Sequence, residues 1–507
     1  MEKVRGVYLN KRTLGMILLG IALTATLLVG FFGIRYEDQL EQACHVLLVL
    51  TLAAVLSALL VICARPKIKP ENLFLLLVIL FGLLFMVAIT PLAVPDEYHH
   101  YLSTLSQTSK VLYGKCQADA AYLNVDDISI HNISYETFQN MLNGLFNEGI
   151  SGQIKTFDDE TAGYPVQYAP QMVGMGLAML LHLNRYWVFL LGDFTNLLFY
   201  AAVTYAAIRR IPVGKVPMMI VALLPMSMQQ ASSYSSDAFI NAMAFLLAAE
   251  MVRAIVGKGK LPWQSMLAIG LAGVLLAPAK GVYAVLLMML IMIPKERFSS
   301  SRARWGFLIG LLTVSVAAVA WTYRAWFAER LGVAAANPEA EEATGYTFAW
   351  LLTHPLQAAA ILLRTLVEAG PDFYLDTMVG YALAGLTMYI NHGWVNMFVI
   401  LMAGTAIVGQ PGEEPMPKKV RVFGLCVALL CLLAVMGSML VGWTTFGAET
   451  VEGVQGRYLL PIAPLALLCL RGDLCVPKRS TLRLSGAVTA VLLGLTLMNI
   501  VDFLLMM

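Results

Sequence analysis

The feature that most constrains this chain is the recurrence of apolar segments of about 18 residues or more, the length that crosses a bilayer as an α-helix. Inside lipid, backbone amides must be paired within their own segment, which selects helices. The composition agrees, because 59% of the 507 residues are hydrophobic and only 13% are charged, against about 25% in ordinary soluble domains. The sequence therefore predicts an all-α polytopic transmembrane helical bundle, with residues 1–507 as a single domain.

The basic residues predict the orientation of this bundle, since Lys and Arg near span ends mark the cytoplasmic side. Seven short loops hold 24 of the 34 Lys and Arg but only four of the 32 Asp and Glu. These loops are residues 1–12, 65–71, 209–215, 253–260, 295–305, 418–421 and 471–483. We assign all seven to the cytoplasm, which places the N-terminus inside and the C-terminus outside.

About 13 spans satisfy both hydropathy and this charge pattern. They cover residues 14–33, 44–64, 71–91, 186–208, 216–231, 237–256, 264–279, 282–294, 306–323, 394–409, 420–442, 458–470 and 485–505. Residues 166–183 and 355–391 are also apolar, but both ends of each must lie outside, so we interpret them as juxtamembrane or re-entrant helices. A full span in either would place basic loops on the wrong face.

Two segments outside the membrane are long, and long ordered loops usually carry function. The first large extracytoplasmic loop covers residues 92–185 and includes a juxtamembrane helix, and the second covers residues 324–393. The net charge of +2 says little about partners. No basic stripe interleaved with aromatic residues is present, so no nucleic acid partner is expected.

The sharpest motif is the run from Pro95 to His100, where the third predicted span leaves the membrane on the outer face. Asp96 or Glu97 has the chemistry of a general base on a sugar hydroxyl, and His100 follows Asp96 by one helical turn. The two carboxylates also suit a divalent cation such as Mg or Mn. The plain alternative is a solvated helix start, where the dipole favours acidic side chains after a proline.

Two further outer-face residues carry opposite charges. Asp237 opens a predicted helix after a polar turn, where an acidic residue is also a routine helix cap. Lys280 lies between two apolar helices too short for a core of about 30 Å, so we expect it in a recessed hairpin tip. A lysine at such depth needs an anionic partner, and a phosphate would serve.

The last motif is the run Gly453-Val454-Gln455-Gly456-Arg457-Tyr458. Glycines allow close approach of the backbone to a ligand, and arginine can hold a phosphate through two parallel hydrogen bonds. Gln455 and Tyr458 are candidate substrate contacts, and the plain alternative is an arginine that reaches lipid headgroups. Tyr164 and Tyr168 form either a stacking surface for a sugar or an interfacial aromatic belt.

Several common catalytic motifs are absent from the sequence. It has no Gly-x-Gly-x-x-Gly, no phosphate-loop lysine motif, no His-Glu-x-x-His and no Gly-x-Ser-x-Gly. Nucleotide hydrolysis, zincin chemistry and serine-hydrolase chemistry therefore lose their usual signatures.

The order of these motifs resembles a bacterial multi-pass membrane family of predicted GT-C superfamily glycosyltransferases. The resemblance covers about residues 70–470, and its most specific pieces are Pro-Asp-Glu-x-x-His at 95–100 and Gly-Val-Gln-Gly-Arg-Tyr at 453–458. It implies a GT-C-like fold and transfer of a sugar from a polyprenyl-phosphate donor to a glycan or lipid acceptor outside the cytoplasm, usually with inversion. Two additional spans before the acidic run depart from the family pattern.

The resemblance also implies roles for individual residues. Asp96, with Glu97 beside it, matches the base or metal ligand, and Asp237 matches the supporting acidic residue. Lys280 and Arg457 match the groups that hold the carrier phosphate. The leading hypothesis is a membrane glycosyltransferase of the cell envelope with an extracytoplasmic active site. The alternatives are a transporter or flippase for lipid-linked glycans and a polysaccharide polymerase or ligase.

Overall fold

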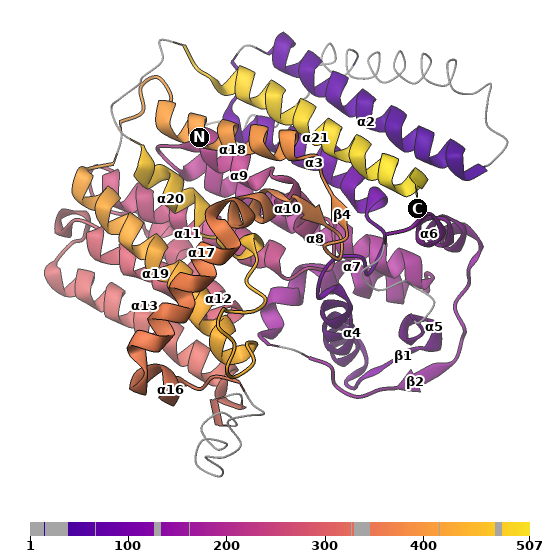
Figure 1. Cartoon of the computed structure of the whole chain (residues 1–507), viewed down its shortest axis with the longest axis horizontal. Helices are drawn as coiled ribbons and strands as arrows, with labels where there is room; N and C mark the ends of the chain where they lie inside the picture. Colours follow the sequence, from indigo (N-terminus) through magenta and orange to yellow (C-terminus); the bar gives the residue numbers. More distant parts are fainter. Residues whose placement is uncertain are drawn as a thin grey trace.

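Helices make up most of the structure. The computed structural model describes residues 39–506 and Gly15, except for residues 66, 126–132, 162, 326, 329–344, 415 and 472–478. In this part of the chain, seven helices are long and apolar enough to cross a membrane by length and composition. They are α2 (Gln39–Ala64), α3 (Pro70–Ala88), α8 (Arg185–Arg210), α11 (Asp237–Val256), α13 (Ser301–Thr322), α19 (Lys418–Gly442) and α21 (Leu482–Met506) (Figure 1).

These seven helices agree with predicted spans, whereas five other predicted spans are short or interrupted. The short ones are α12 (Trp263–Ala279), the 3-10 helix η2 (Gly281–Met292) and α18 (His392–Val408). The interrupted ones are α9 (Lys215–Ala222) with α10 (Pro225–Ala231), and η5 (Gly456–Leu459) with α20 (Ala463–Leu470). The remaining predicted span, residues 14–33, lies outside the described residues, so the total of 13 stays a prediction.

Proline accounts for the two interruptions. A proline has no N–H and disfavours helical geometry at the residue before it. Leu224, which precedes Pro225, is extended with φ −60° and ψ 146°, and α10 begins at the proline. Pro461 lies between η5 and α20, and Pro464 stands in the first turn of α20. A hydropathy window averages over such breaks, and so the sequence alone predicts one continuous span in each place.

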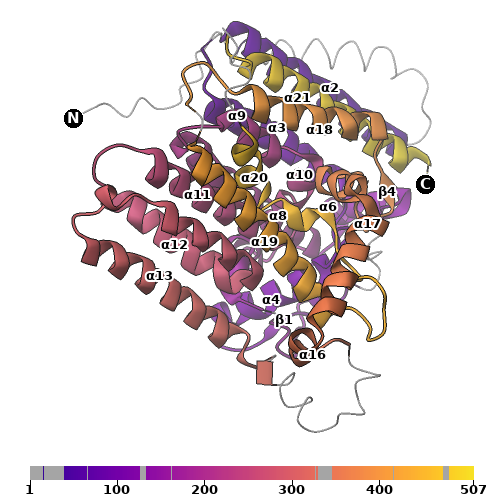
Figure 2. The same cartoon turned by 60° about the vertical axis from the view of Figure 1, so that its left-hand side comes forward.

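Burial orders the helices from the centre of the bundle to its edge. In α11, 83% of the most apolar window is buried, and this helix packs against α8 and α12. In α13 only 17% is buried, and this helix lies at the edge with α12 beside it (Figure 1, Figure 2). Near the other edge, α2 packs against α21, and both contact α3. Because α11 begins at Asp237, the most buried of the seven candidate spans places a functional candidate at its first residue.

The segment predicted as the first large outer loop, residues 92–185, forms a small folded unit beside the bundle. It contains α4 (Glu97–Tyr113), β1 (Gln117–Asp119), α5 (Ala120–Leu123), α6 (Tyr135–Asn147), β2 (Ile154–Thr156), η1 (Pro165–Tyr168) and α7 (Ala169–Leu180). Strands β1 and β2 are antiparallel, with Gln117 opposite Thr156 and Asp119 opposite Ile154. The predicted juxtamembrane segment 166–183 is thus mainly α7, whose 12 residues are too few to cross a bilayer.

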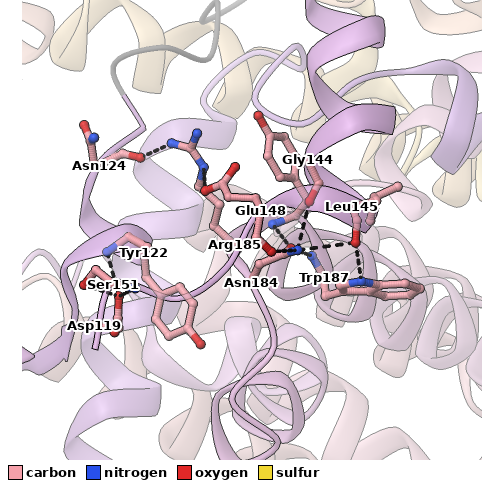
Figure 3. Close-up of polar contacts among 12 residues, drawn as sticks. Asp119, Tyr122, Asn124, Gly144, Leu145, Glu148, Ser151, Asn184, Arg185 and Trp187 are labelled. Atoms are coloured by element: carbon pink, nitrogen blue, oxygen red, sulfur yellow. Dashed lines mark hydrogen bonds and ion pairs between the residues drawn. The ribbon is translucent and has the colours of Figure 1, made fainter. Parts of the chain in front are cut away.

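Figure 3 shows how this unit is attached to the start of α8. Asn184 caps α8 by accepting hydrogen bonds from two backbone N–H groups, and its side-chain nitrogen donates to the carbonyls of Gly144 and Glu148, both at 2.9 Å. Arg185, the first residue of α8, forms an ion pair with Glu148 at 2.9 Å. These contacts join the end of α6 to a candidate spanning helix, which holds this folded unit in one position.

The segment predicted as the second outer loop packs against η5, α18 and α19. It contains α16 (Phe348–Thr353), α17 (Pro355–Val379) and a hairpin of β3 (Ala382–Leu383) and β4 (Met388–Tyr389). The acidic Glu339, Glu341 and Glu342 in this loop lie outside the described residues. Helix α17 is kinked at Gly370, whose φ of 76° lies outside the helical region and which precedes a proline. The kink directs the second half of α17 towards η5 and α10.

Several of the basic loops that were assigned to the cytoplasm contact one another. Lys215 lies 3.6 Å from the carboxylate of Glu71, and Arg297, in η3 (Lys295–Arg297), donates to the carbonyl of Ala254 at 3.0 Å. Arg471 binds Glu413 at 2.6 Å, and Glu413 also accepts from the backbone N–H of Gly214. These contacts link residues 65–71, 209–215 and Arg471 in one group and residues 253–260 and 295–305 in another, as expected if these loops share one side, whereas residues 1–12 lie outside the described residues. The side of the membrane on which these loops lie stays a prediction.

Candidate functional site

The turn before α4 has a strained backbone that exposes Asp96. Both Leu92 (φ 63°) and Asp96 (φ 64°) adopt left-handed geometry, which is rare for residues other than glycine and most tolerated by Asn and Asp. Glu97 stabilises this turn, because its Oε2 accepts from the backbone N–H of Val94 at 3.0 Å. The side chain of Asp96 is left 56% exposed at the N-terminus of α4.

Glu97, although adjacent to Asp96, points into the protein. It is 1% exposed, and its second oxygen accepts from the backbone N–H of Tyr234 at 3.1 Å. Burial raises the pKa of Glu97 to about 7, against the opposing effect of its backbone hydrogen bonds. This carboxylate therefore connects the turn before α4 to the turn before α11, and its contacts are those of a positioning residue.

The polar turn that precedes α11 is held by amide side chains. Asn196 donates to the carbonyl of Ser233 at 2.7 Å, and Gln230 donates to Asp237 Oδ2 at 3.0 Å. The carbonyl oxygen of Gln230 in turn accepts from Asn241 at 2.8 Å, which fixes the orientation of the Gln230 amide. One oxygen of Asp237 is thereby committed to the protein scaffold, and the other faces Lys280.

Lys280 lies at the junction of α12 and η2, as the sequence predicts for a hairpin tip. Its Nζ is 3.5 Å from Asp237 Oδ1 and 4.1 Å from the centre of the Tyr458 ring. An aromatic face attracts an ammonium group, so the carboxylate and the ring together hold this cation. Its side chain is 31% exposed, which leaves room for a further anionic partner.

The glycine-containing run places Arg457 in the same cluster. Gly456 donates to Thr377 Oγ1 at 2.9 Å, and a Cβ on Gly456 would lie 2.1 Å from the carbonyl oxygen of Tyr374. Only glycine permits this approach of η5 to α17. The guanidinium of Arg457 then reaches Asp96 Oδ2 at 2.7 Å, and its carbon lies 5.1 Å from the Tyr458 ring.

The structure therefore brings the four predicted charged residues together. Asp96 contacts Arg457, Asp237 contacts Lys280, and both cations share the ring of Tyr458. We refer to Asp96, Asp237, Lys280, Arg457 and Tyr458 as the charged cluster. Burial alone would lower the pKa of Arg457. The neighbouring Tyr458 and the two carboxylates have the larger, opposite effect and raise the pKa of Arg457 above its ordinary value.

His100 and Tyr168 lie next to the charged cluster. Nδ1 of His100 is 3.2 Å from the hydroxyl of Tyr168, which is 1% exposed. Burial lowers the pKa of His100 to about 4, although the carboxylates of Asp237 and Asp96 act in the opposite direction. His100 is therefore neutral at physiological pH, and Tyr168 is a buried neighbour rather than an exposed stacking surface.

Gln455 and Tyr164, the two remaining residues predicted to contact substrate, differ in their surroundings. The side-chain oxygen of Gln455 is buried and has no hydrogen-bond partner within the described part of the chain. Tyr164 is partly buried at the start of η1, and no hydrogen bond, ion pair or ring contact between described residues joins it to the charged cluster. Gln455 thus retains an unused acceptor beside Arg457, whereas nothing in the geometry distinguishes Tyr164 from an ordinary packing residue.

A metal site at Asp96 and Glu97 has little support in this geometry. Both oxygens of Glu97 accept backbone N–H groups, and Asp96 is paired with Arg457. Across the residues that the structure describes, no three His, Cys, Asp or Glu side chains form a group that could hold a metal ion. The divalent cation stays a prediction with Asp96 as its exposed ligand.

Sequence reasoning missed residues that support the site from apolar segments. Tyr283, in η2, donates to the carbonyl of Tyr458 at 2.8 Å, and Thr377, in α17, holds Gly456. Neither residue belongs to a polar motif, so no local signal identifies it. Gln230 lies within the polar turn that the sequence highlights, and its position seven residues before Asp237 is the signal that could have identified it.

The comparisons with known proteins give a family. No curated protein and no solved structure shows a significant match. The family described as predicted membrane protein DUF2142 matches residues 76–466, which include every residue of the charged cluster. Since this match extends over more than half of the chain, the protein belongs to the DUF2142 family of predicted membrane proteins.

Proposed function

We propose that this protein is a membrane glycosyltransferase that transfers a sugar from a polyprenyl-phosphate donor to a cell-surface glycan or lipid acceptor on the extracytoplasmic face. The observation that carries the proposal is the charged cluster, in which two carboxylates and two cations meet around one aromatic ring. Such a transfer needs an anionic base on the acceptor side and cationic groups on the leaving side.

The leaving phosphate is assigned to Arg457 and Lys280. The side chain of Arg457 is only 6% exposed, and its Nε has no hydrogen-bond partner in the described structure. A buried guanidinium with an unused donor suits a phosphate, which can accept two parallel hydrogen bonds from it. Lys280 is partly exposed beside it and adds the second positive charge.

Asp96 is assigned as the base. It is the most exposed carboxylate of the charged cluster, and Arg457 is its ion-pair partner. When a donor phosphate takes the guanidinium, Asp96 is released to accept the proton of an acceptor hydroxyl. The acceptor oxygen then bonds to the anomeric carbon, the bond from that carbon to the phosphate oxygen breaks, and polyprenyl phosphate leaves with the electron pair.

The neighbouring residues have supporting roles in this mechanism. Asp237 keeps Lys280 in place, and Gln230 orients Asp237. Glu97 joins the two turns that carry Asp96 and Asp237. His100 is neutral and contacts Tyr168, so it adds no positive charge that would compete with the phosphate-binding cations.

The decisive experiment is a transfer assay with the purified full-length protein. Polyprenyl phosphates that carry different sugars are incubated with candidate glycan or lipid acceptors, and the glycosylated product is detected by mass spectrometry. Appearance of product supports a transferase, and EDTA in a parallel reaction tests the divalent cation. The same protein is also reconstituted into proteoliposomes. Movement of intact donor from one leaflet of their membrane to the other, without formation of product, would instead indicate a flippase and contradict the proposal.

A further inference from the structure

A pocket of about 830 Å³ lies where three distant segments of the chain meet, and no residue of the charged cluster lines it. Its walls come from Leu48 of α2, from the residues around the β3–β4 hairpin and the first turn of α18, and from the last turns of α21. This volume is within the range of sites for small organic ligands. Because α2 and α21 are candidate spans, the pocket borders the region expected to lie in lipid.

One wall of the pocket is aromatic. The ring of Tyr381 stacks on that of His392 with centroids 3.9 Å apart, and Tyr389 lies 5.3 Å from Tyr381. Trp394 belongs to the same wall, and Tyr389 is 59% exposed. The faces of such rings carry negative electrostatic potential and attract organic cations.

The charges at this pocket also favour a cation. Asp502 lines it from the last turns of α21, and no ion pair or hydrogen bond of its side chain is found among the described residues. A carboxylate at the carbonyl end of a helix is unfavourable unless a cation is near. His392 lies 3.3 Å from Asp376, so any charge on this histidine is balanced within that pair. None of the described lining residues is Lys or Arg.

The remaining walls suit an amphiphile. Leu48, Met498, Val501 and Leu505 form an apolar surface from α2 and α21. At its polar edge, Asn499 accepts a hydrogen bond from the backbone N–H of Asn391 at 3.2 Å through Oδ1. The amide nitrogen of Asn499 is then available to donate to a phosphodiester oxygen.

We propose that this pocket binds the ammonium headgroup of phosphatidylethanolamine. The ammonium group lies against Asp502 and the ring of Tyr389, and an acyl chain follows the apolar surface of α2 and α21. An anionic phospholipid lacks the cation that this charge distribution requires. The site is separate from the charged cluster, so the inference does not depend on the transferase activity.

The test compares phospholipids on the full-length protein in detergent micelles, with bound lipid counted by native mass spectrometry. Wild-type protein is expected to retain phosphatidylethanolamine about fivefold better than phosphatidylglycerol. Asp502→Asn should abolish this preference, and Tyr389→Ala should weaken phosphatidylethanolamine binding about threefold or more.

Matched controls are Glu414→Gln, an exposed carboxylate away from the pocket, and Tyr113→Ala, an exposed tyrosine on α4. Both should bind lipid as the wild type does. Equal retention of the two phospholipids by the wild-type protein would overturn the proposal without reference to any variant. Wild-type lipid preference in both Asp502→Asn and Tyr389→Ala would overturn it as well.

Discussion

Arg457 and Asp96, which are 361 positions apart in the sequence, form an ion pair of 2.7 Å between Nη2 and Oδ2. The side chain of Arg457 is 6% exposed, and the side chain of Asp96 is 56% exposed. A buried cation needs an anionic partner, and Asp96 provides it when no ligand is bound. In the proposed mechanism the donor phosphate replaces Asp96 at Arg457, so donor binding and release of the base are one event.

Asp96→Asn is expected to lower turnover by about a hundredfold or more, because a neutral amide cannot accept the acceptor proton. The amide keeps the shape of the side chain and an oxygen for Arg457. Asp158→Asn, at an exposed carboxylate of the same segment 92–185, is the control and should leave turnover unchanged. The measurement is product formation at saturating donor. Wild-type turnover in Asp96→Asn would remove Asp96 from the mechanism.

Arg457→Lys is expected to raise the KM for the donor about tenfold, because lysine keeps the charge but loses the paired donors of the guanidinium. Arg364→Lys serves as the control, since Arg364 pairs with Glu449 on the surface. Donor titrations of both variants give the comparison. An unchanged donor KM in Arg457→Lys would mean that the phosphate binds elsewhere.

Gly456→Ala is expected to reduce both activity and thermal stability. The new methyl group would lie 2.1 Å from the carbonyl oxygen of Tyr374 and 2.3 Å from the backbone nitrogen of Met378, so η5 must move away from α17. Arg457 would move with it. Gly437→Ala is the matched control, because no atom lies within 4 Å of its added Cβ. Equal melting temperatures and activities of the two variants would contradict the assigned contact.

The pH dependence of stability should separate Glu97 from His100. Burial raises the pKa of Glu97 from 4.5 to about 7, so the folded protein holds this proton more tightly than the unfolded chain. Stability from Glu97 therefore falls as pH rises from 4.5 to 7, by roughly 3 kcal/mol. Burial lowers the pKa of His100 from 6.5 to about 4, so its contribution falls as pH drops through that range.

Each substitution should reveal the effect of the remaining group. Glu97→Gln leaves His100, so the melting temperature should be lower at about pH 5 than at about pH 7. His100→Asn leaves Glu97, and the order should reverse. Thermal unfolding in detergent at the two pH values measures both. The same pH response in the two variants would show that these groups do not titrate as their burial implies.

The sequence was sufficient to predict the membrane character, the long helices and the candidate motifs. Hydropathy and basic residues at span ends are local properties, and seven predicted spans coincide with long apolar helices. The motifs around Asp96, Asp237, Lys280 and Arg457 were visible because polar residues stand out in an apolar chain. Those four residues meet in the structure.

Tertiary structure alone decided how these residues are used. Asp96 and Glu97 are adjacent and chemically alike, yet the left-handed turn leaves Asp96 exposed and Glu97 buried. The carboxylate of Glu97 accepts a hydrogen bond from the backbone N–H of Tyr234. Tyr283 and Thr377 support the site from segments without any polar motif. The physical reason is that hydropathy is read along one segment, whereas exposure and partners depend on which helices pack together across hundreds of residues.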